Sequence, residues 1–404
     1  MFEILKMYSK LFAKPSKDFG LAKYVFPSEN VGLYLHIPFC KHFCDFCPYH
    51  KIKYDAVLAR DYVNLIKKEL SLHEIKLFDS LYIGGGTPSD DLDLLAGIFE
   101  FLRERVSREI ALEVHPLDAT LQKLKRIKDL GVNYISLGLQ SFNDEVLIHF
   151  GRDHSARDNY LALKNALDLD FDFVDVDVVF DPLRFSDKVA HADLENVMRL
   201  SPQQISVYPM MRFSYTKFKG TRNRSRREFK VFDTLDEIAD KNGYRRDTLW
   251  TYVRKDLKKR YTSVAREFYL GLGLSASTFT GYVFATNTFS LARYRENLER
   301  RKLPIGSLFH LSAFQGALYY SFWSLYTGQL DFNSLIRYFP KSRKKLRLLL
   351  ESLRFRGYLT KRNELYLLTH KGRKKLHQLE EWLTYAYIDP LWRQLRSEGT
   401  QNLI

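Results

Sequence analysis

The stretch YLHIPFCKHFCDFCPYH, residues 34–50, contains all three cysteines of the chain, Cys40, Cys44 and Cys47. An odd and clustered set of cysteines is not a disulfide framework, so these thiols indicate a metal centre in a reducing compartment. Thiolates are soft ligands that suit iron–sulfur clusters and zinc. Three thiolates on a four-iron cluster leave one iron open to a small molecule. The C-x3-C-x2-C spacing therefore favours such a cluster.

Zinc is the alternative metal for this stretch. Structural zinc usually has four protein ligands, and His36, His42 or His50 could supply the fourth. Nothing in a zinc site requires the glycine motif described below, so we favour the cluster. His36 lies in an otherwise apolar run, where a hydrogen-bonded core histidine and a neighbour of the metal both fit the sequence.

Around this stretch, short runs rich in β-forming residues alternate with stretches of helical character. The β-rich runs are residues 32–37, 80–83, 110–114, 134–139, 174–180 and 204–208. Strand–helix alternation of this kind predicts a parallel sheet with right-handed crossovers. A closed barrel needs eight such units. We therefore expect an α/β fold, an open partial (β/α)6 barrel, with functional groups at the carboxyl ends of its strands.

Helices are predicted between these runs from periodicity and capping residues. Residues 56–73 have apolar side chains at helical spacing. Asp90 and Asp91 are plausible N-caps for a helix that follows them, and residues 120–130 end at Gly131.

The sequence GGGTP, residues 84–88, directly follows the second predicted strand. Three glycines allow a backbone to approach a ligand closely and to offer N–H and C=O groups to it. A glycine-rich turn is often only a turn, and this one lacks the lysine of a phosphate-binding P-loop. Its place at the same end of the sheet as the cysteines makes a binding role more plausible.

The composition is that of a globular protein. The 404 residues include 63 Lys and Arg against 48 Asp and Glu, a formal charge of +15, and 45% are hydrophobic. These values exclude a disordered or fibrous chain. Aromatic residues make up 15%, which suits a pocket for a flat ligand.

No membrane segment or secretory signal is expected. Residues 268–291 and 303–330 carry no formal charge, but their many Ser, Thr, Gly, Tyr and Gln residues favour buried segments over membrane spans. Residues 1–30 contain no apolar run followed by small residues. We therefore expect a cytoplasmic protein.

Four segments are predicted along the chain. They are a lead segment (1–30), a partial barrel (31–210), a basic barrel-closing or substrate region (211–305), and a C-terminal helical, winged-helix-like accessory domain (306–404). The third segment contains TRNRSRREFK, residues 221–230. A solvated loop and an anion-binding surface are both open interpretations of that run.

Taken together, these motifs resemble the radical S-adenosylmethionine (SAM) superfamily. Within it they are similar to the branch of oxygen-independent coproporphyrinogen III oxidases, which includes haem chaperones and haem-degrading or methyl-transferring relatives. The motifs that carry the resemblance are YLHIPFC (34–40), GGGTPS (84–89), LEVHP (112–116), GVNYISLGLQSF (131–142), FGRDH (150–154), VDVVF (176–180) and ISVYP (205–209). The resemblance covers residues 32–208 and continues more loosely through 269–281.

The resemblance implies a [4Fe–4S] cluster on Cys40, Cys44 and Cys47, with the open iron binding the amino and carboxylate groups of SAM. The residues at positions that match the family's SAM contacts are Tyr34, Gly86, Thr87, Glu113, Gln140, Arg152 and Asp177. Glycine backbone suits the ammonium of SAM, acidic side chains its hydroxyls, and arginine its carboxylate. A second SAM molecule is left open.

Each polar member of that set also has a structural interpretation. Glu113 and Asp177 could belong to ion pairs, Gln140 could be a hydrogen-bonded core amide, and Arg152 could lie on a solvated loop.

The implied function is reductive cleavage of SAM to a 5′-deoxyadenosyl radical, acting on a tetrapyrrole or haem-like substrate. Lys and Arg side chains from 212–260 would suit the substrate's propionate groups. The resemblance also implies a reducing partner such as flavodoxin or ferredoxin. The alternatives are a haem-binding chaperone that retains the cluster and a radical SAM C-methyltransferase. No RNA-binding sequence motif is present, so nucleic acid is not expected as a partner. The sequence leaves the oligomeric state open.

Two departures from the branch touch its substrate side. Tyr134 stands where much of the branch has an arginine, and DPLR, residues 181–184, replaces a glycine-rich turn. We therefore do not expect an orthodox coproporphyrinogen decarboxylase.

Overall fold

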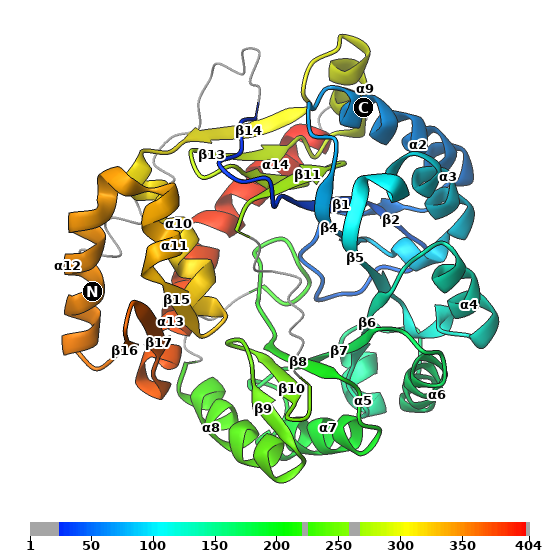
Figure 1. Cartoon of the computed structure of the whole chain (residues 1–404). Coiled ribbons are helices and arrows are strands. Elements are labelled where there is room, and N and C mark those ends of the chain that lie inside the picture. Colours follow the sequence, from blue (N-terminus) through cyan, green and yellow to red (C-terminus); the bar gives the residue numbers. More distant parts are fainter. Residues whose placement is uncertain (1–23, 220–224, 258–266, 401–404) are drawn as a thin grey trace. The chain divides into compact units, whose positions relative to one another are not determined.

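A computed structural model describes residues 24–219, 225–257 and 267–400. The chain forms two compact units, each described here by itself. The first comprises the chain up to 34, residues 65–79 and the chain from 262; the second comprises 35–64 and 80–261. Figure 1 shows the course of the chain by colour. The four sequence segments predicted above remain a prediction.

The second unit is built on a mostly parallel sheet. Two of its strands begin in the first unit, β1 (Gly32–Ile37), which enters the second unit at residue 35, and β4 (Phe78–Gly85), which enters it at residue 80. The others are β5 (Val106–Val114), β6 (Tyr134–Gln140), β7 (Phe173–Phe180), β8 (Gln204–Pro209), β9 (Tyr244–Arg246) and β10 (Thr251–Arg254). Their order is β1-β4-β5-β6-β7-β8-β10-β9. Pairing is parallel from β5 to β8, whereas β10 is antiparallel to both β8 and β9. All six predicted strands are confirmed, and the antiparallel edge makes the sheet mixed.

Helices of the second unit lie on the outer side of these strands (Figure 1). They are α3 (Leu92–Leu102), α4 (Leu121–Asp129), α5 (Asp144–His149), α6 (Ala156–Leu167), α7 (Asp187–Arg199) and α8 (Ser225–Lys241), and α2 (Ala56–Ser71) begins in this unit. Asp91 caps α3 by accepting from the amides of Asp93 and Leu94, as predicted. Strands β6 and β7 are almost wholly buried, each with a single partly exposed residue, although β7 carries Asp175 and Asp177.

The predicted basic run 221–230 is only partly described. From Ser225 onward the chain is helix α8, so the solvated-loop interpretation is wrong for that part. Within it, Glu228 is buried and Lys230 forms an ion pair with Asp187 over 2.8 Å. Residues 221–224 lie outside the described residues.

The first unit contains an antiparallel sheet. Its strands are β11 (Tyr269–Leu272), β12 (Ser277–Phe279), β13 (Val283–Asn287) and β14 (Ile305–His310), in the order β14-β13-β12-β11, and α9 (Leu291–Glu299) follows β13. The two uncharged stretches of the sequence form this sheet and helix α10 (Ala313–Tyr326). Within the described ranges, no helix has both the length and the apolar character to cross a bilayer.

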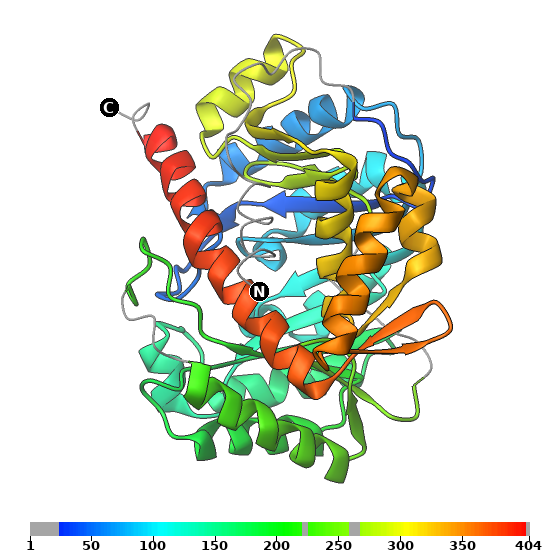
Figure 2. The ribbon, with the colours of Figure 1, turned by 90° about the vertical axis from the view of Figure 1, so that its left-hand side faces the viewer.

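The rest of the first unit is mostly helical. After α10 come β15 (Gln329–Asp331), α11 (Phe332–Tyr338), α12 (Arg343–Phe355), β16 (Leu359–Arg362), β17 (Leu365–Leu368), α13 (His370–Leu383) and α14 (Asp389–Thr400). Figure 2 shows α13 and α14 as one long helix, which is continuous through the π-helical turn Thr384–Ile388. The predicted helical character of the C-terminal region and its small hairpin are confirmed.

Candidate functional site

A short parallel pair of strands holds the cysteine loop of the second unit in place. β2 (Phe39–Cys40) pairs with β3 (Ile52–Lys53), with Phe39 opposite Ile52. The amide of Tyr54 also donates to the carbonyl of Cys40 over 2.9 Å. The loop that carries Cys44 and Cys47 is therefore closed at its base by backbone hydrogen bonds.

The three thiols influence one another electrostatically. Burial raises the pKa of the Cys40 thiol to about 12, and burial also raises the pKa of Cys47. Charge on Cys44 raises both of these pKa values further, whereas Lys51 lowers both. Clustered thiols in such surroundings stay neutral until a metal supplies positive charge. The donor set therefore fits a metal group bound by three thiolates.

The spacing of the sulfurs does not fit one zinc ion. Two sulfurs on one zinc, each at about 2.3 Å, can be at most about 4.6 Å apart. Among the described residues, no set of three candidate ligand atoms within 4.8 Å of one another includes a cysteine sulfur. A cluster spreads its ligands over several metal ions and accepts a wider spacing.

Two of the three histidines considered for zinc, His36 and His42, have ring contacts to other groups. Nε2 of His36 lies 2.9 Å from the carbonyl oxygen of His50, and His36 is buried. Nε2 of His42 lies 3.3 Å from a carboxylate oxygen of Asp153. His36 is thus a hydrogen-bonded core residue, which was one of the two interpretations left open.

Close packing explains why residues 84–86 are glycines. A Cβ on Gly86 would lie 2.5 Å from the carbonyl oxygen of Phe39, and one on Gly84 would lie 2.7 Å from Oε1 of Glu113. Gly85 has a φ of +117°, and a Cβ there would lie 2.6 Å from the His36 ring. The amides of Gly86 and Thr87 donate to the carbonyls of Ile37 and Phe39, while Thr87 Oγ1 donates to the Cys40 sulfur over 3.3 Å. The end of β4 is thereby fixed against the cysteine loop.

Glu113, on β5, is not part of an ion pair. Its carboxylate accepts from the Tyr82 hydroxyl over 2.8 Å and from the Gly85 amide over 3.2 Å, and burial raises its pKa. No Lys, Arg or His of the described chain lies within ion-pair distance of it. The ion-pair interpretation is therefore wrong, and the carboxyl group remains able to accept from a ligand hydroxyl.

Asp177, on β7, resembles Glu113 in being a hydrogen-bonded carboxyl group with a raised pKa. Ser136 donates to it over 2.9 Å, and burial, followed by the charge of Asp175, raises its pKa well above the ordinary value. Its charge in turn raises the pKa of Tyr208, although burial is the larger cause of that shift. Polar groups of several strands therefore meet at the carboxyl end of the sheet, as the topology predicts.

Gln140 and Arg152 each carry a buried polar atom that finds no hydrogen-bond partner within the described residues, Oε1 of Gln140 and Nε of Arg152. Gln140 has a φ of +67°, a conformation that non-glycine residues rarely adopt. Arg152 donates to the Cys44 sulfur and to the Gly138 carbonyl, each over 3.0 Å. The solvated-loop interpretation of Arg152 is thus wrong. Such orphaned atoms next to the cysteines fit a polar ligand that completes their hydrogen bonds.

Tyr34 is the one residue of the predicted SAM set in the first unit. It lies in β1 and is half-buried. The other six, with the three cysteines, belong to the second unit and come from its strands and the loops after them.

Sequence reasoning missed several polar residues of this site. They are Lys51, Tyr82, Ser136, Asp175 and Tyr208. The only available signal was the two-residue alternation of side chains along a strand. It places Asp175 on the same strand face as Asp177, and Ser136 on the corresponding face of its own strand. That signal does not distinguish a site residue from a core hydroxyl.

The basic residues of 212–257 were expected to bind propionates, but most already have carboxylate partners. Arg246 pairs with Asp236 over 2.7 Å and Lys255 with Asp240 over 2.5 Å. Arg212 donates to both carboxylate oxygens of Asp181, over 2.8 and 2.6 Å. These side chains already pair with carboxylates of the chain, and the expectation that they bind propionates stays a prediction.

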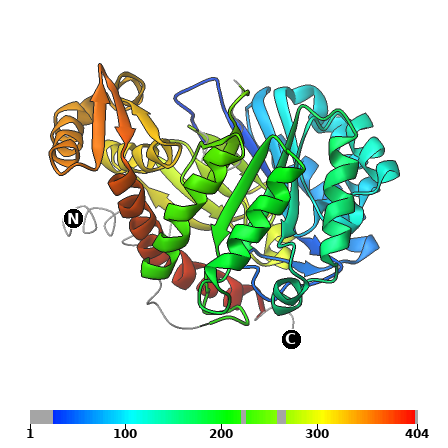
Figure 3. The ribbon, with the colours of Figure 1, turned by 90° about the horizontal axis from the view of Figure 1, so that it is seen from below.

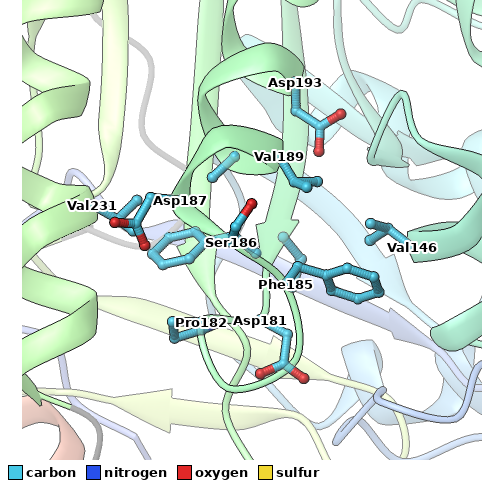
Figure 4. A pocket seen from close by; sticks show the side chains of 12 residues that line it. Val146, Asp181, Pro182, Phe185, Ser186, Asp187, Val189, Asp193 and Val231 are labelled. Carbon is cyan, nitrogen blue, oxygen red and sulfur yellow. The ribbon is translucent and has the colours of Figure 1, made fainter.

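The DPLR turn after β7 is organised by that last pair. Asp181 is 2% exposed and also accepts from the amide of Leu183 over 3.1 Å. Figure 4 shows Asp181 and Pro182 in the lining of a pocket next to Phe185, Val189 and Val146. None of the predicted cluster or SAM residues lines that pocket. The pocket is therefore formed around the DPLR turn, where the sequence departs from the family pattern, and is not part of the cysteine site.

With this geometry established, comparison with known proteins identifies the family. Residues 34–194 match the description Radical SAM superfamily. The predicted resemblance to the radical SAM superfamily is confirmed for this segment. This match covers the cysteine loop and the first five strands of the parallel sheet.

Among radical SAM proteins, the chain is similar to members of the predicted branch. It is 24% identical to the heme chaperone HemW of Bacillus subtilis (strain 168) over 290 residues, 67% of this chain and 76% of that protein. It is 26% identical to the oxygen-independent coproporphyrinogen III oxidase of Escherichia coli (strain K12) over 324 residues, 71% of this chain and 70% of that protein. The predicted branch is confirmed, and its members carry two different activities.

A solved structure extends the likeness to the whole fold. The coproporphyrinogen III oxidase HemN from Escherichia coli, described as a radical SAM enzyme, has a TM-score of 0.76 and 22% identity, covering 95% of this chain and 99% of that one. The predicted radical SAM fold with a C-terminal helical region is thereby confirmed.

Proposed function

We propose that this chain binds a [4Fe–4S] cluster through Cys40, Cys44 and Cys47, binds SAM beside it, and cleaves SAM reductively. One observation carries the proposal. Three mutually interacting thiols lie beside Arg152, which donates to the Cys44 sulfur. Arg152 and Gln140 each carry a buried polar atom that lacks a partner among the described residues. The chain has no other cysteine to complete a four-thiolate site.

When bound, such a cluster supplies the electron that breaks the sulfonium C–S bond of SAM and yields a 5′-deoxyadenosyl radical. The chain's own residues position the reactants. Arg152 ties the cysteine loop to β6 through Cys44 and Gly138. Its unpartnered Nε is suited to a carboxylate, as is typical of arginine.

The remaining SAM contacts are inferred from which polar groups already form hydrogen bonds within the chain. The amides of Gly86 and Thr87 donate to backbone carbonyls, and the Thr87 carbonyl accepts from the Asp90 amide. The SAM ammonium would therefore meet the carbonyl oxygen of Gly86, with Thr87 beside it. Glu113 and Asp177 each retain carboxyl oxygens that can accept from ribose hydroxyls. Tyr34 completes the proposed set. We propose one SAM molecule, and equilibrium dialysis counts how many bind.

A tetrapyrrole is the proposed substrate class. The support is the branch to which the relatives belong, one of which is named a coproporphyrinogen oxidase and another a heme chaperone. The polar groups of an acidic tetrapyrrole would need partners other than Arg212, Arg246 and Lys255, because those side chains are paired. A flavodoxin or ferredoxin is the proposed electron donor, and the cytoplasm the proposed location.

The test is anaerobic incubation of reconstituted protein with SAM, a reductant and a panel of tetrapyrroles, analysed by mass spectrometry. We expect 5′-deoxyadenosine together with one altered tetrapyrrole, whose mass distinguishes decarboxylation, ring opening and methyl transfer. If the iron-loaded protein forms no 5′-deoxyadenosine with any member of the panel, the proposal is wrong.

A haem chaperone is the second candidate, favoured by the similarity to heme chaperone HemW of both Bacillus subtilis and Lactococcus lactis. It predicts a stable haem complex and transfer of haem to an acceptor, without change of the haem. A spectral titration measures the complex, and the product assay above separates it from the enzyme. A titration with no spectral change would exclude the chaperone.

A further inference from the structure

The C-terminal part of the first unit has the connectivity of a winged helix. We call residues 313–375 the helix–wing module. Its elements follow one another as α10, β15, α11, α12, β16 and β17, and the small sheet has the order β15-β17-β16. Helices α11 and α12 are separated only by Phe339 and the 3₁₀ turn Pro340–Ser342. In helix-turn-helix proteins, the second helix of such a pair enters the groove of a nucleic-acid duplex.

Most of the net charge of the chain lies in the second half of this module. Residues 341–375 contain thirteen Lys and Arg against two Glu, a net charge of +11. The whole chain has +15. A basic excess of this size on one small module is the electrostatic footprint of a polyanion partner.

The two glutamates are already neutralised within the module. Glu351 pairs with Arg354 over 2.5 Å, and Glu364 pairs with Arg347 over 2.6 Å. Seven exposed basic residues of 341–375 have no carboxylate within ion-pair distance in the described part of the chain. Of these, Lys345 lies over the Phe314 ring and Lys371 donates to the carbonyl of Arg356. The other five are Lys341, Arg343, Lys344, Arg356 and Arg362. These five cations carry charge that folding does not use.

Their positions suit a duplex. Arg343 and Lys344 lie in the first turn of α12, and Arg356 directly follows its last residue. Arg362 is at the tip of the β16–β17 hairpin, which ends in a turn with Asn363 at a φ of +53°. Figure 3 shows this hairpin next to the helices of the module. Helix ends and a hairpin tip are the places from which such a module reaches the phosphates on both sides of a groove.

The outward side of α12 is not polar throughout. Leu346 and Leu350 are buried, whereas Leu348 and Phe355, seven residues apart on the other side, are 75% and 93% exposed. Lys344 lies on the same side, four residues before Leu348. Apolar side chains on a groove-facing helix can contact base edges such as the thymine methyl group.

We propose that the helix–wing module binds a nucleic-acid duplex, with α12 against a groove and the hairpin tip against the phosphate backbone. This inference is independent of the proposed radical chemistry. It also differs from the expectation, drawn from the sequence, that nucleic acid is not a partner. That expectation depended on the absence of a short RNA-binding motif. The order of strands and helices that defines a winged helix is not a short motif.

Fluorescence anisotropy with the full chain tests this proposal. The probes are a short DNA duplex, an RNA duplex of the same sequence, and anionic phospholipid vesicles. If all five unpaired cations contact phosphates, the logarithm of the association constant falls with the logarithm of salt concentration at a slope of about −4.5. Steep binding of either duplex supports the proposal, and the stronger of the two identifies the nucleic acid.

A matched pair of variants distinguishes binding by this surface from a non-specific effect of removing positive charge. The test variant replaces Arg343, Lys344 and Arg356 by Gln, and the control replaces Lys68, Arg301 and Lys302 by Gln, exposed residues of the same unit outside the module. We expect the test variant to reduce the salt slope by about 2.7 and the control to leave it nearly unchanged. Thermal unfolding verifies that both are folded.

Three results would overturn the proposal. They are no duplex binding at low salt, equal loss of binding in the two variants, and binding to anionic vesicles with none to either duplex. Formation of 5′-deoxyadenosine is measured in parallel, so that failure of the duplex proposal and failure of the radical SAM proposal are distinguishable.

Discussion

Arg152 donates a hydrogen bond from its guanidinium group to the sulfur of Cys44 over 3.0 Å. The two residues are 108 positions apart in the sequence. The same guanidinium donates to the carbonyl of Gly138, so one side chain connects the cysteine loop with β6. Donors to a cluster sulfur are one of the means by which a protein adjusts reduction potential.

Replacing Arg152 by Met should lower the reduction potential of the reconstituted cluster and weaken SAM binding at least tenfold. The reason is the loss of a positive donor at the Cys44 sulfur and of the group proposed to face the SAM carboxylate. A redox titration followed by electron paramagnetic resonance measures the first effect, and equilibrium dialysis the second. Arg126→Met is the control, because Arg126 is exposed and pairs with Asp93. Equal potentials in both variants would contradict the assigned role.

Cys44→Ala should abolish both iron and inorganic sulfide in the reconstituted protein, because only two thiols would remain in the chain. Iron and sulfide analysis measures this loss. Phe43→Ala changes the neighbouring, exposed position of the same loop and should retain both elements. A Cys44→Ala protein that keeps its full iron content would show that the metal is held elsewhere.

Gly85→Ala should destabilise the protein more than Gly243→Ala. Both glycines have positive φ, +117° and +80°, and an L-residue in the left-handed region costs about 1–2 kcal/mol. Only at Gly85 would the added Cβ collide, at 2.6 Å from the His36 ring, whereas Gly243 has no other group within 4 Å. We expect a further loss of about 1–3 kcal/mol at Gly85. Denaturant unfolding gives both values, and equal losses would refute the collision.

Asp181→Asn should cost about 3–5 kcal/mol of unfolding free energy, because it leaves the largely buried Arg212 without its counter-ion. Adding Arg212→Met should recover part of that loss. Asp93→Asn breaks the exposed pair with Arg126 and should cost far less. No recovery in the double variant would mean that Asp181 acts mainly through the amide of Leu183.

Glu69 should make the stability of the protein depend on pH. Burial raises its pKa from 4.5 to about 7, although Tyr294, the Gly273 amide and Asn287 all donate to it. Between these two pH values the folded state keeps a proton that the unfolded state has lost. The stabilisation from that proton is therefore complete below pH 4.5 and lost as the pH rises through about 7.

Glu69→Gln removes this titration. The difference in unfolding free energy between the native protein and the variant should change by about 3 kcal/mol between these pH values and stay constant at higher pH. Denaturant unfolding at a series of pH values measures it. A difference that does not vary with pH would show that Glu69 titrates normally.

Much of the fold follows from local sequence patterns. Residues 174–180 are rich enough in β-forming residues to predict a strand, and Asp91 predicts the start of α3. These features depend on side chains a few residues apart, so they can be read from the chain itself. The cysteine spacing similarly determines that a metal centre of three thiolates is possible.

The contacts that make these residues a site were decided only by the tertiary structure. Arg152 donates to the Cys44 sulfur, and Arg212 pairs with Asp181, because strand order and register bring distant segments together. A sequence lists such side chains without their partners. The same holds for α12 and its hairpin, where folding pairs the two glutamates and leaves the five cations exposed. Residue types set which interactions are available, and three-dimensional proximity decides which of them form.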